Sequence, residues 1–259
     1  MKKIKKMLSV TFLAMIVVPA ICIGGRIAQY QYEDKKLDQV AELVANYTVK
    51  QPAVSMSAGI VMESESFVDI DGLQKENPDV IGFLEIPGTS VAYPVMKSEE
   101  QDYYIRRGFD GKRSVYGSIY MDNASYMQGT NIVLYGHNMK SGKMFGTLKH
   151  YLDTEYRDTH KEIRYITQDR ITCYEVCAVM TASAEDEKLV QNLIPYTEQE
   201  MENLRVYLYD HGGMTEEIDW GDQLITLITC EYTKKDGRLF VIGKLKEEIV
   251  RKQSGDMSR

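Results

Sequence analysis

The sequence predicts a mainly β domain in which about eight strands close into a barrel and helices occupy the connections. Short apolar and β-branched runs of strand length recur along the chain, and turns containing Gly or Pro separate them. One long segment before the last pair of strands has helical character instead. A chain of 259 residues can build one such domain with accessory helices.

Residues 7–25 are predicted to be a membrane anchor. Met7–Gly24 contains no charged residue and is long enough to cross a bilayer as a slightly short helix. The lysine-rich tail 1–6 places the N-terminus in the cytoplasm by the positive-inside rule, so the remainder of the chain would lie outside the cell. The residues around Ala20 form a poor cleavage site, which favours an uncleaved single-pass anchor over a signal peptide.

Residues 26–69 are predicted to form an extracellular helical stalk. In Arg26–Gln51, apolar residues recur at helical spacing with charges between them, and Pro52 is expected to end the helix. Gln51–Ser66 carries few charges and is interpreted as a link to the next unit.

The main domain is predicted at 70–250, followed by a flexible tail at 251–259. It begins with a short helix near Ile70–Pro78, for which Asp71 is a possible cap. Strand patterns follow, at 80–86, 91–96, 117–121, 130–135, 163–167, 171–182, 224–230 and 239–242. Short helices are expected in two connections, at 99–107 and 144–152.

The segment Ser183–Asp219 is the one long interruption among the strands. Thr197 and Glu200 have the spacing of a capping box, and apolar residues follow on one face. A helix is therefore predicted at Glu198–Tyr209, ending near Gly212. Insertions of this size on a β scaffold are often binding elements.

The balance of charge restricts the partners of the chain. The formal net charge is −7, and without the four lysines of residues 1–6 the remaining 27 basic residues (31 − 4) face 38 acidic ones, which gives −11. Such an acidic chain is not expected to bind nucleic acid. No His/Cys pair has the spacing of metal ligands in a loop, and we expect neither a metal nor a cofactor.

The four cysteines differ in their contexts. Cys22 belongs to the predicted anchor. Cys173 and Cys177 lie four residues apart in one predicted strand, about 13 Å from each other, so they are too distant for a disulfide and are interpreted as small buried residues. Cys230, at the end of a predicted strand, is then the best candidate for a free thiol outside the cell.

The loop after Cys230 decides whether Arg238 can act with it. A tight two-residue turn at Asp236–Gly237 would leave the two residues about 17 Å apart along the strands. A wide loop over 231–237 would instead place them at facing ends of paired strands. We predict the wide loop.

His137 directly follows the predicted strand 130–135, and Gly136 would allow an unusual backbone turn beside it. A Cys–His pair performs acyl transfer through a thioester, and an arginine can bind the oxyanion or hold the substrate. The alternative is that Cys230 is a core cysteine and Arg238 a solvated charge. For each residue alone, this alternative and the catalytic role are equally supported. The remaining histidines are interpreted as solvated; they are His150, His160 and His211.

Together these residues resemble the sortase signature, in the order His, Cys, Arg. The matching segments are TLITC at 226–230, YGH at 135–137 and Arg238 before LFVIGKL. The segments FLEIPGTSVAYPVM, YYIRRGFDGKRSVYGSIYMDN and LYGHNMKSGKMFGTLKHY are similar to class B sortases in particular. The resemblance covers roughly Ile70–Leu245.

The resemblance implies an eight-stranded sortase-type barrel and a membrane-anchored cysteine transpeptidase of a Gram-positive bacterium. Such enzymes cleave a C-terminal sorting signal of secreted proteins after its Thr, in class B often in an Asn-Pro-x-Thr motif. They transfer the protein to a peptidoglycan amine or, in some members, to a pilin lysine. By position, Cys230 would be the nucleophile, His137 the acid/base and Arg238 the clamp. The substrate-groove candidates are Gln101, Ile105, Ser118, Thr229 and Glu231.

Two rival functions use the same residues differently. A wall-peptide hydrolase of the papain type would place its cysteine before its histidine, whereas here His137 comes first. A catalytically idle, tethered binding module would bury Cys230. Both remain alternatives at the level of the sequence.

Overall fold

The computed structural model describes residues 2–125, 130–233 and 236–252; the side chains of residues 2–14 and 190 are not described. The chain divides into two compact units, Met1–Glu42 and Leu43–Arg259. The first unit consists of helix α1 (Lys2–Asn46), whose last turn belongs to the second. The helix therefore ends before Pro52.

The predicted single-pass anchor at 7–25, and the membrane localisation and membrane contact derived from it, are wrong for the residues described. None of the helices in the described part of the chain has both the length and the apolar character that crossing a membrane requires. Of the predicted anchor, the side chains of residues 7–14 lie outside the description.

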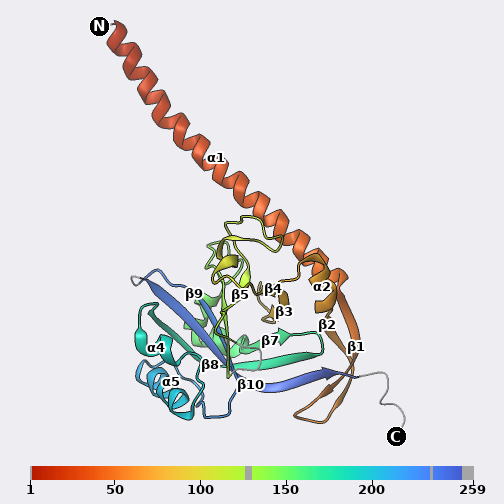
Figure 1. The fold of residues 1–259 in the computed structure, drawn as a ribbon. Coiled ribbons are helices and arrows are strands. Elements are labelled where there is room, and N and C mark those ends of the chain that lie inside the picture. The colour runs from red at the N-terminus through yellow and green to blue at the C-terminus, as the bar shows by residue number, and fades with distance from the viewer. Residues whose placement is uncertain (1, 126–129, 234–235, 253–259) are drawn as a thin grey trace. The chain divides into compact units, whose positions relative to one another are not determined.

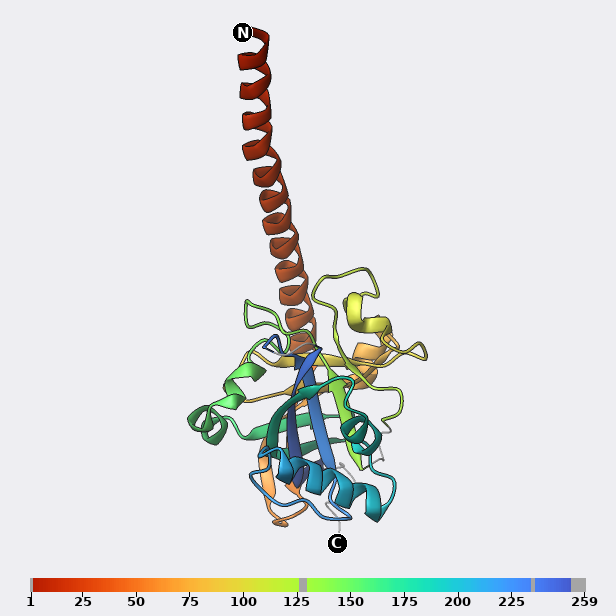
Figure 2. The same cartoon turned by 90° about the vertical axis from the view of Figure 1, so that its left-hand side faces the viewer.

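The second unit is built on a closed β-barrel (Figures 1 and 2). Among the described residues its sheet has ten strands, of which β1 and β2 lie outside the ring, so eight strands close it, as the sequence predicted. In order around the barrel, they are β10 (Gly237–Arg251), β8 (Arg170–Ser183), β7 (Glu162–Ile166), β3 (Val80–Glu85), β4 (Ala92–Met96), β5 (Ile119–Met121), β6 (Asn131–Tyr135) and β9 (Leu224–Cys230). Pairing of β9 with β10 completes the ring.

Strand β9 is buried from Leu224 to Thr229 because both of its faces are covered. Leu224 and Ile228 on one face pack into a cluster that includes residues of the long insertion, such as Leu204. Ile225 and Leu227 alternate with them and are fully buried as well. A strand covered on both faces carries apolar residues on both of them, and β9 does so without alternating between buried apolar and exposed polar positions.

The long insertion carries two helices, α4 (Glu187–Asn192) and α5 (Glu198–Asp210). The predicted capping box of α5 is confirmed: the Thr197 side chain accepts from the Glu200 amide, and the Glu200 carboxylate accepts from the Thr197 amide. Met201, Leu204 and Leu208 form the buried face. This face rests against the barrel in the same apolar cluster as Ile228.

The other helices are shorter than predicted. Helix α2 (Ile70–Glu76) is capped by Asp69, whose carboxylate accepts from the Gly72 amide, and not by Asp71. The regions predicted as helices at 99–107 and 144–152 contain only short 3₁₀ segments, η1 (Tyr103–Arg106) and η2 (Leu148–Leu152). A further helix, α3 (Thr154–Thr159), follows η2.

The segment interpreted as a link forms two strands instead, β1 (Thr48–Ser55) and β2 (Val61–Val68). Strand β1 pairs with the C-terminal end of β10, at Ala53↔Arg251. The register shifts around Pro52, which has no N–H to give to a ladder. Arg251 thus belongs to a strand, and residues 253–259 of the predicted tail lie outside the described residues.

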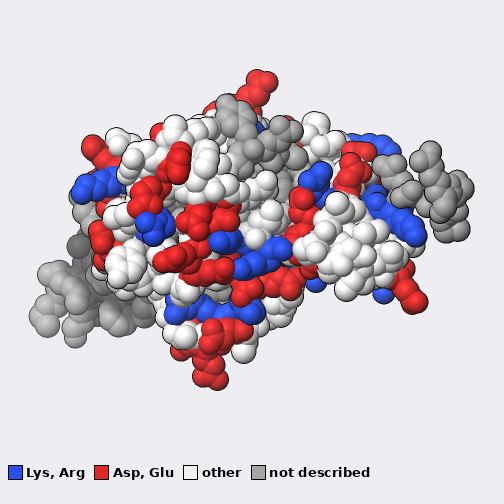
Figure 3. Space-filling model, turned by 90° about the horizontal axis from the view of Figure 1, so that it is seen from below, with Lys and Arg blue, Asp and Glu red and all other residues white. Residues whose placement is uncertain are grey.

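Acidic and basic side chains lie among one another on the face seen in Figure 3. Two of the ion pairs in the described part of the chain are Lys161–Glu175 at 2.9 Å and Lys246–Glu216 at 2.6 Å. Exposed pairs of this kind contribute about 0–1 kcal/mol each. The stability of the domain therefore rests mainly on its apolar core.

Candidate active site

Three neighbouring strands carry the predicted catalytic residues at one end. In the parallel pair β6–β9, Tyr135 lies opposite Ile228, so continuing this register sets His137 beside Cys230. In the antiparallel pair β9–β10, Cys230 lies directly opposite Arg238. The wide-loop prediction is confirmed, and the tight turn at 236–237 is excluded because Cys230 and Arg238 are paired.

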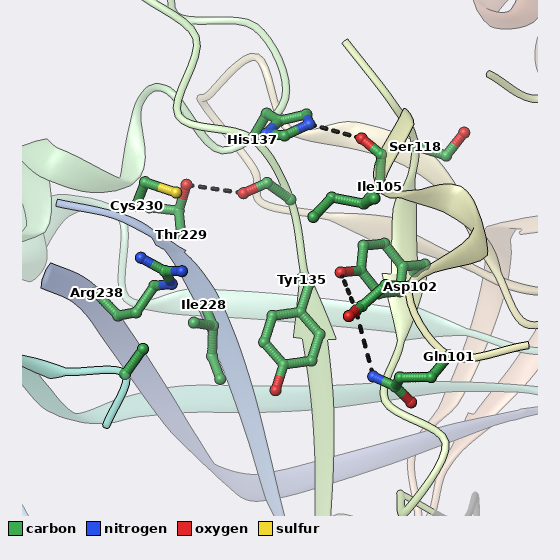
Figure 4. A pocket seen from close by; sticks show the side chains of 13 residues that line it. Gln101, Asp102, Ile105, Ser118, Tyr135, His137, Ile228, Thr229, Cys230 and Arg238 are labelled. Carbon is green, nitrogen blue, oxygen red and sulfur yellow. Dashed lines mark hydrogen bonds between the residues drawn. The ribbon is translucent and has the colours of Figure 1, made fainter. Parts of the chain in front are cut away.

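These three residues open into one cavity of about 260 Å³ (Figure 4). It is lined by Gln101, Asp102, Ile105, Ser118, Tyr120, Tyr135, Gly136, His137, Ala184, Ile228, Thr229, Cys230 and Arg238. In the close-up, the Cys230 thiol and the Arg238 guanidinium lie on one side of the cavity and Gln101 lies on the other.

His137 is held by a backbone group from a distant part of the chain. Its Nε2 lies 2.7 Å from the carbonyl oxygen of Ile105 in η1. Burial lowers the pKa of His137; the bond to Ile105 raises it, and the nearby Arg106 lowers it further. The net shift favours a neutral imidazole, the form that can accept a proton.

The end of β9 is tied to the turn that carries His137 by three hydrogen bonds. The Asn138 side-chain amide donates to the Cys230 carbonyl at 2.7 Å, and the Thr229 hydroxyl donates to the Gly136 carbonyl at 2.8 Å. The Gly136 amide donates to the Ile228 carbonyl at 3.1 Å. Strand β6 ends at Tyr135, before this turn. Two of the three hydrogen bonds that link the turn to β9 therefore come from side chains.

Gly136 is required for space rather than for an unusual turn. Its φ is not in the left-handed region, contrary to the sequence interpretation. A Cβ built on it would lie 2.5 Å from the Ile119 side chain and 2.7 Å from that of Phe145. Glycine lets the backbone beside His137 pack against the barrel.

Cys230 differs from the two other cysteines of the barrel in its exposure. It is partly exposed at the cavity, whereas Cys173 and Cys177 are buried in β8. Burial raises the pKa of Cys173 to about 11 and that of Cys177 to about 12, so both stay protonated at neutral pH. Neither contributes to the lining of the cavity.

Of the five substrate-groove candidates, four line the cavity and Glu231 does not. The Ser118 hydroxyl donates to the Arg107 carbonyl at 2.9 Å, and Thr229 is only 2% exposed, so these two side chains shape the wall. Gln101 and Ile105 are open to solvent. The Glu231 carboxylate accepts from the amide and the hydroxyl of Thr233, within the loop after the cysteine. Their contacts with substrate remain predictions.

Sequence reasoning missed the wall that faces the thiol. The Tyr120 hydroxyl donates to the Asp102 carboxylate at 2.8 Å, and the rings of Tyr120 and Tyr135 stack with centroids 5.4 Å apart. Burial raises the pKa of both phenols, which therefore stay neutral. Asp102 has a left-handed backbone, with φ 58°. Asn138 was also missed, although it stands in the same short motif as His137.

Comparison with known proteins agrees with the barrel and with the site. A model of the sortase domain matches residues 84–246, so the chain belongs to the sortase family of cysteine transpeptidases. Sortase B of Listeria monocytogenes is 29% identical over 251 residues, which cover 94% of this chain and 98% of the relative. Sortase B of Staphylococcus aureus is 25% identical over 257 residues, with coverage of 94% and 98%.

The solved structures place the chain within class B of this family. The crystal structure of sortase B from Bacillus anthracis aligns with a TM-score of 0.67 and 27% identity, over 87% of this chain and 100% of that one. Sortase B from Clostridium perfringens aligns with a TM-score of 0.60 and 26% identity, over 68% of this chain and 98% of that one.

Proposed function

We propose that the protein cleaves an Asn-Pro-x-Thr-like sorting signal near the C-terminus of a secreted protein, after its Thr, and joins the new carboxyl end to an amine of cell-wall peptidoglycan. The observation that carries this proposal is the strand register, which sets Cys230 between His137 and Arg238 on one cavity. The class B relatives support the substrate class.

The first half-reaction would form a thioester. The Cys230 sulfur attacks the carbonyl carbon of the substrate Thr, and the carbonyl oxygen becomes an oxyanion that the Arg238 guanidinium stabilises. The proton lost by the thiol resides on the His137 imidazole. His137 then gives this proton to the departing amine as the C–N bond breaks, and the acyl group remains on sulfur.

The second half-reaction would reverse these roles. The accepting amine attacks the thioester carbon, Arg238 again stabilises the oxyanion, and His137 takes the proton of the amine. The C–S bond breaks, and His137 passes the proton that it took from the amine to the Cys230 sulfur. Water in place of the amine would give hydrolysis. The ratio of ligated to hydrolysed product therefore measures how well the cavity favours an amine over water.

The test is to incubate the full-length protein with a peptide library built on the Asn-Pro-x-Thr pattern, with and without added amines. We expect cleavage after Thr and, with an amine, a ligated product. Cys230→Ala should abolish both, whereas the control Cys173→Ala should keep both. Cleavage that persists in Cys230→Ala would refute the proposal.

The accepting amine distinguishes the wall-anchoring function from its alternative. One arm of the experiment offers glycine amines and wall-peptide amines, and the other offers lysine ε-amines within a protein segment. The ligation yields of the two arms should differ. Preference for the first supports peptidoglycan as the acceptor. Preference for the second would indicate a pilin-polymerising enzyme, and cleavage without ligation in either arm would indicate a hydrolase in place of a transpeptidase.

A further inference from the structure

The hydrogen bond between His137 and Ile105 shows which ring nitrogen of His137 carries a proton. A carbonyl oxygen can only accept a hydrogen bond, and the Nε2 of His137 lies 2.7 Å from the Ile105 oxygen. The ring nitrogen at this distance must therefore carry the proton. In Figure 4 the bonded nitrogen faces Ile105, across the cavity from Cys230.

We propose that the Ile105 carbonyl fixes His137 as the Nε2–H tautomer and thereby makes Nδ1 the ring atom that takes and gives the proton during transfer. The second part of this statement rests on the proposed function; the first does not. The Ile105 carbonyl accepts from Nε2–H in the neutral ring and in the imidazolium alike. Proton traffic at Nδ1 can then proceed while the ring stays held.

Gly117 sets the position of this carbonyl. It has a left-handed backbone, with φ 60°, and a Cβ built on it would lie 2.6 Å from the Ile105 oxygen and 2.9 Å from the Tyr104 oxygen. The Ser118 amide donates to the Tyr104 carbonyl at 3.1 Å. Glycine at this position therefore lets the segment before β5 close against η1 and aims the Ile105 carbonyl at His137.

Residues on both sides of Ile105 are anchored as well. The Tyr104 ring is 2% exposed, and its hydroxyl donates to the Asp79 carboxylate at 2.7 Å. The Ser118 hydroxyl donates to the Arg107 carbonyl, just after η1. A displaced Ile105 carbonyl therefore cannot be accommodated by a simple shift of the whole segment. We regard Gly117 and the Ile105 backbone as positioning elements for His137.

The direct test is nitrogen NMR of full-length protein labelled with ¹⁵N-histidine, recorded above the pKa of His137. The His137 signals are assigned by their loss in His137→Gln. We expect a pyrrole-like shift at Nε2 and a pyridine-like shift at Nδ1. The reverse pattern would overturn the proposal. This readout does not depend on activity, so a protein with the Nε2–H tautomer that transfers no peptide would refute the proposed function but leave the tautomer assigned.

The second test compares Gly117→Ala with Gly111→Ala. Gly111 also has a left-handed backbone, with φ 69°, but a Cβ there meets nothing within 4 Å, so its variant carries the same backbone cost without pressing on a carbonyl. In Gly117→Ala, we expect mixed tautomers at His137 and a loss of kcat of at least ~10-fold, since general acid–base catalysis supplies more than this. Gly111→Ala should keep the wild-type spectrum and turnover.

An unchanged tautomer and unchanged turnover in Gly117→Ala would overturn the role of Gly117. If Gly117→Ala fails to fold, as judged by circular dichroism, the wild-type spectrum alone decides the assignment at His137.

Discussion

At the scale of single residues, His137 combines two opposing influences. Burial lowers its pKa, while the Ile105 carbonyl favours the charged ring. The result is an imidazole that remains neutral over a wider pH range than an exposed histidine. This has a consequence for stability as well as for proton transfer.

The stability of the fold should fall on acidification partly because of His137. Its pKa is lower in the folded than in the unfolded chain, so the unfolded chain binds the proton first as the pH falls. The contribution is present above the unfolded pKa, about 6.5, and is lost as the pH falls through the folded pKa. Urea denaturation at pH 7.5 and pH 5 should show a larger loss for the wild type than for His137→Gln. Equal losses would contradict a lowered pKa.

Arg238→Lys should lose turnover although it keeps the charge. The guanidinium offers several donors in one plane, and one N–H already donates to the Gly237 carbonyl at 3.0 Å. A lysine cannot hold that bond and present donors to an oxyanion in the same geometry. We expect kcat to fall roughly 10²-fold. Arg157, in α3, does not line the cavity, so Arg157→Lys serves as the control, and wild-type turnover in Arg238→Lys would remove Arg238 from the mechanism.

The residues that the sequence revealed and those that it missed differ in a physical way. Cys230, His137 and Arg238 stand at strand ends within short, distinctive segments, so chemistry and spacing were enough to select them. Gly117, Asp102 and Tyr120 matter because of groups that approach them from elsewhere in the chain. Local sequence carries no signal for such neighbours.

At the scale of elements, the site depends on the alignment of β6, β9 and β10. The turn after β6 lies against the end of β9, and the start of β10 lies against the other side of β9. Any change that slides the turn after β6 would separate His137 from Cys230. The Asn138 side chain is the cross-link closest to the thiol.

Asn138→Asp should loosen the link between the turn after β6 and the end of β9. The Asn138 side-chain amide donates to the Cys230 carbonyl at 2.7 Å. The substitution keeps the shape of the side chain but sets a carboxylate oxygen, which cannot donate, against that carbonyl. The free energy of unfolding should fall by about 1–3 kcal/mol, with a larger effect on kcat than on KM. Asn192→Asp, which removes a donor to the Lys188 carbonyl in α4, is the control. A variant that keeps both stability and kcat would show that Asn138 does not position Cys230.

Helix α5 should contribute to stability through its buried face. Leu204 is fully buried in the cluster that includes Ile228, so Leu204→Ala should lower the free energy of unfolding by about 2–5 kcal/mol. Val206, on the same helix, is 45% exposed, and Val206→Ala should change it much less. Thermal and urea denaturation of the two variants measure this difference. Equal effects would indicate that the insertion is not packed against the barrel.

Elements with strong local patterns could be predicted, and elements defined by a distant partner could not. The apolar runs of β6 and β9 and the capping box of α5 are visible in the sequence, and all three are found. Strands β1 and β2 lack a clear alternation, and β1 is stabilised by the far end of β10. The apolar pattern of 7–25 predicts an anchor, and the described part of α1 does not support it.

At the scale of the whole molecule, closure of the barrel gathers the cavity from distant segments of the chain. The segment around Ile105 comes from a connection before β5, His137 from the end of β6, and Arg238 from the last strand. The surface in Figure 3 mixes both signs of charge, so its fields largely cancel over short distances.

The most direct test of the central claim is peptide mapping of the full-length protein by mass spectrometry after it is mixed with an Asn-Pro-x-Thr peptide in the absence of an amine. The account predicts a hydroxylamine-sensitive adduct that ends in Thr and lies on Cys230. An adduct on another residue would contradict Cys230 as the nucleophile. Cleavage without a detectable thioester, even in a variant that releases the acyl group slowly, would contradict it as well.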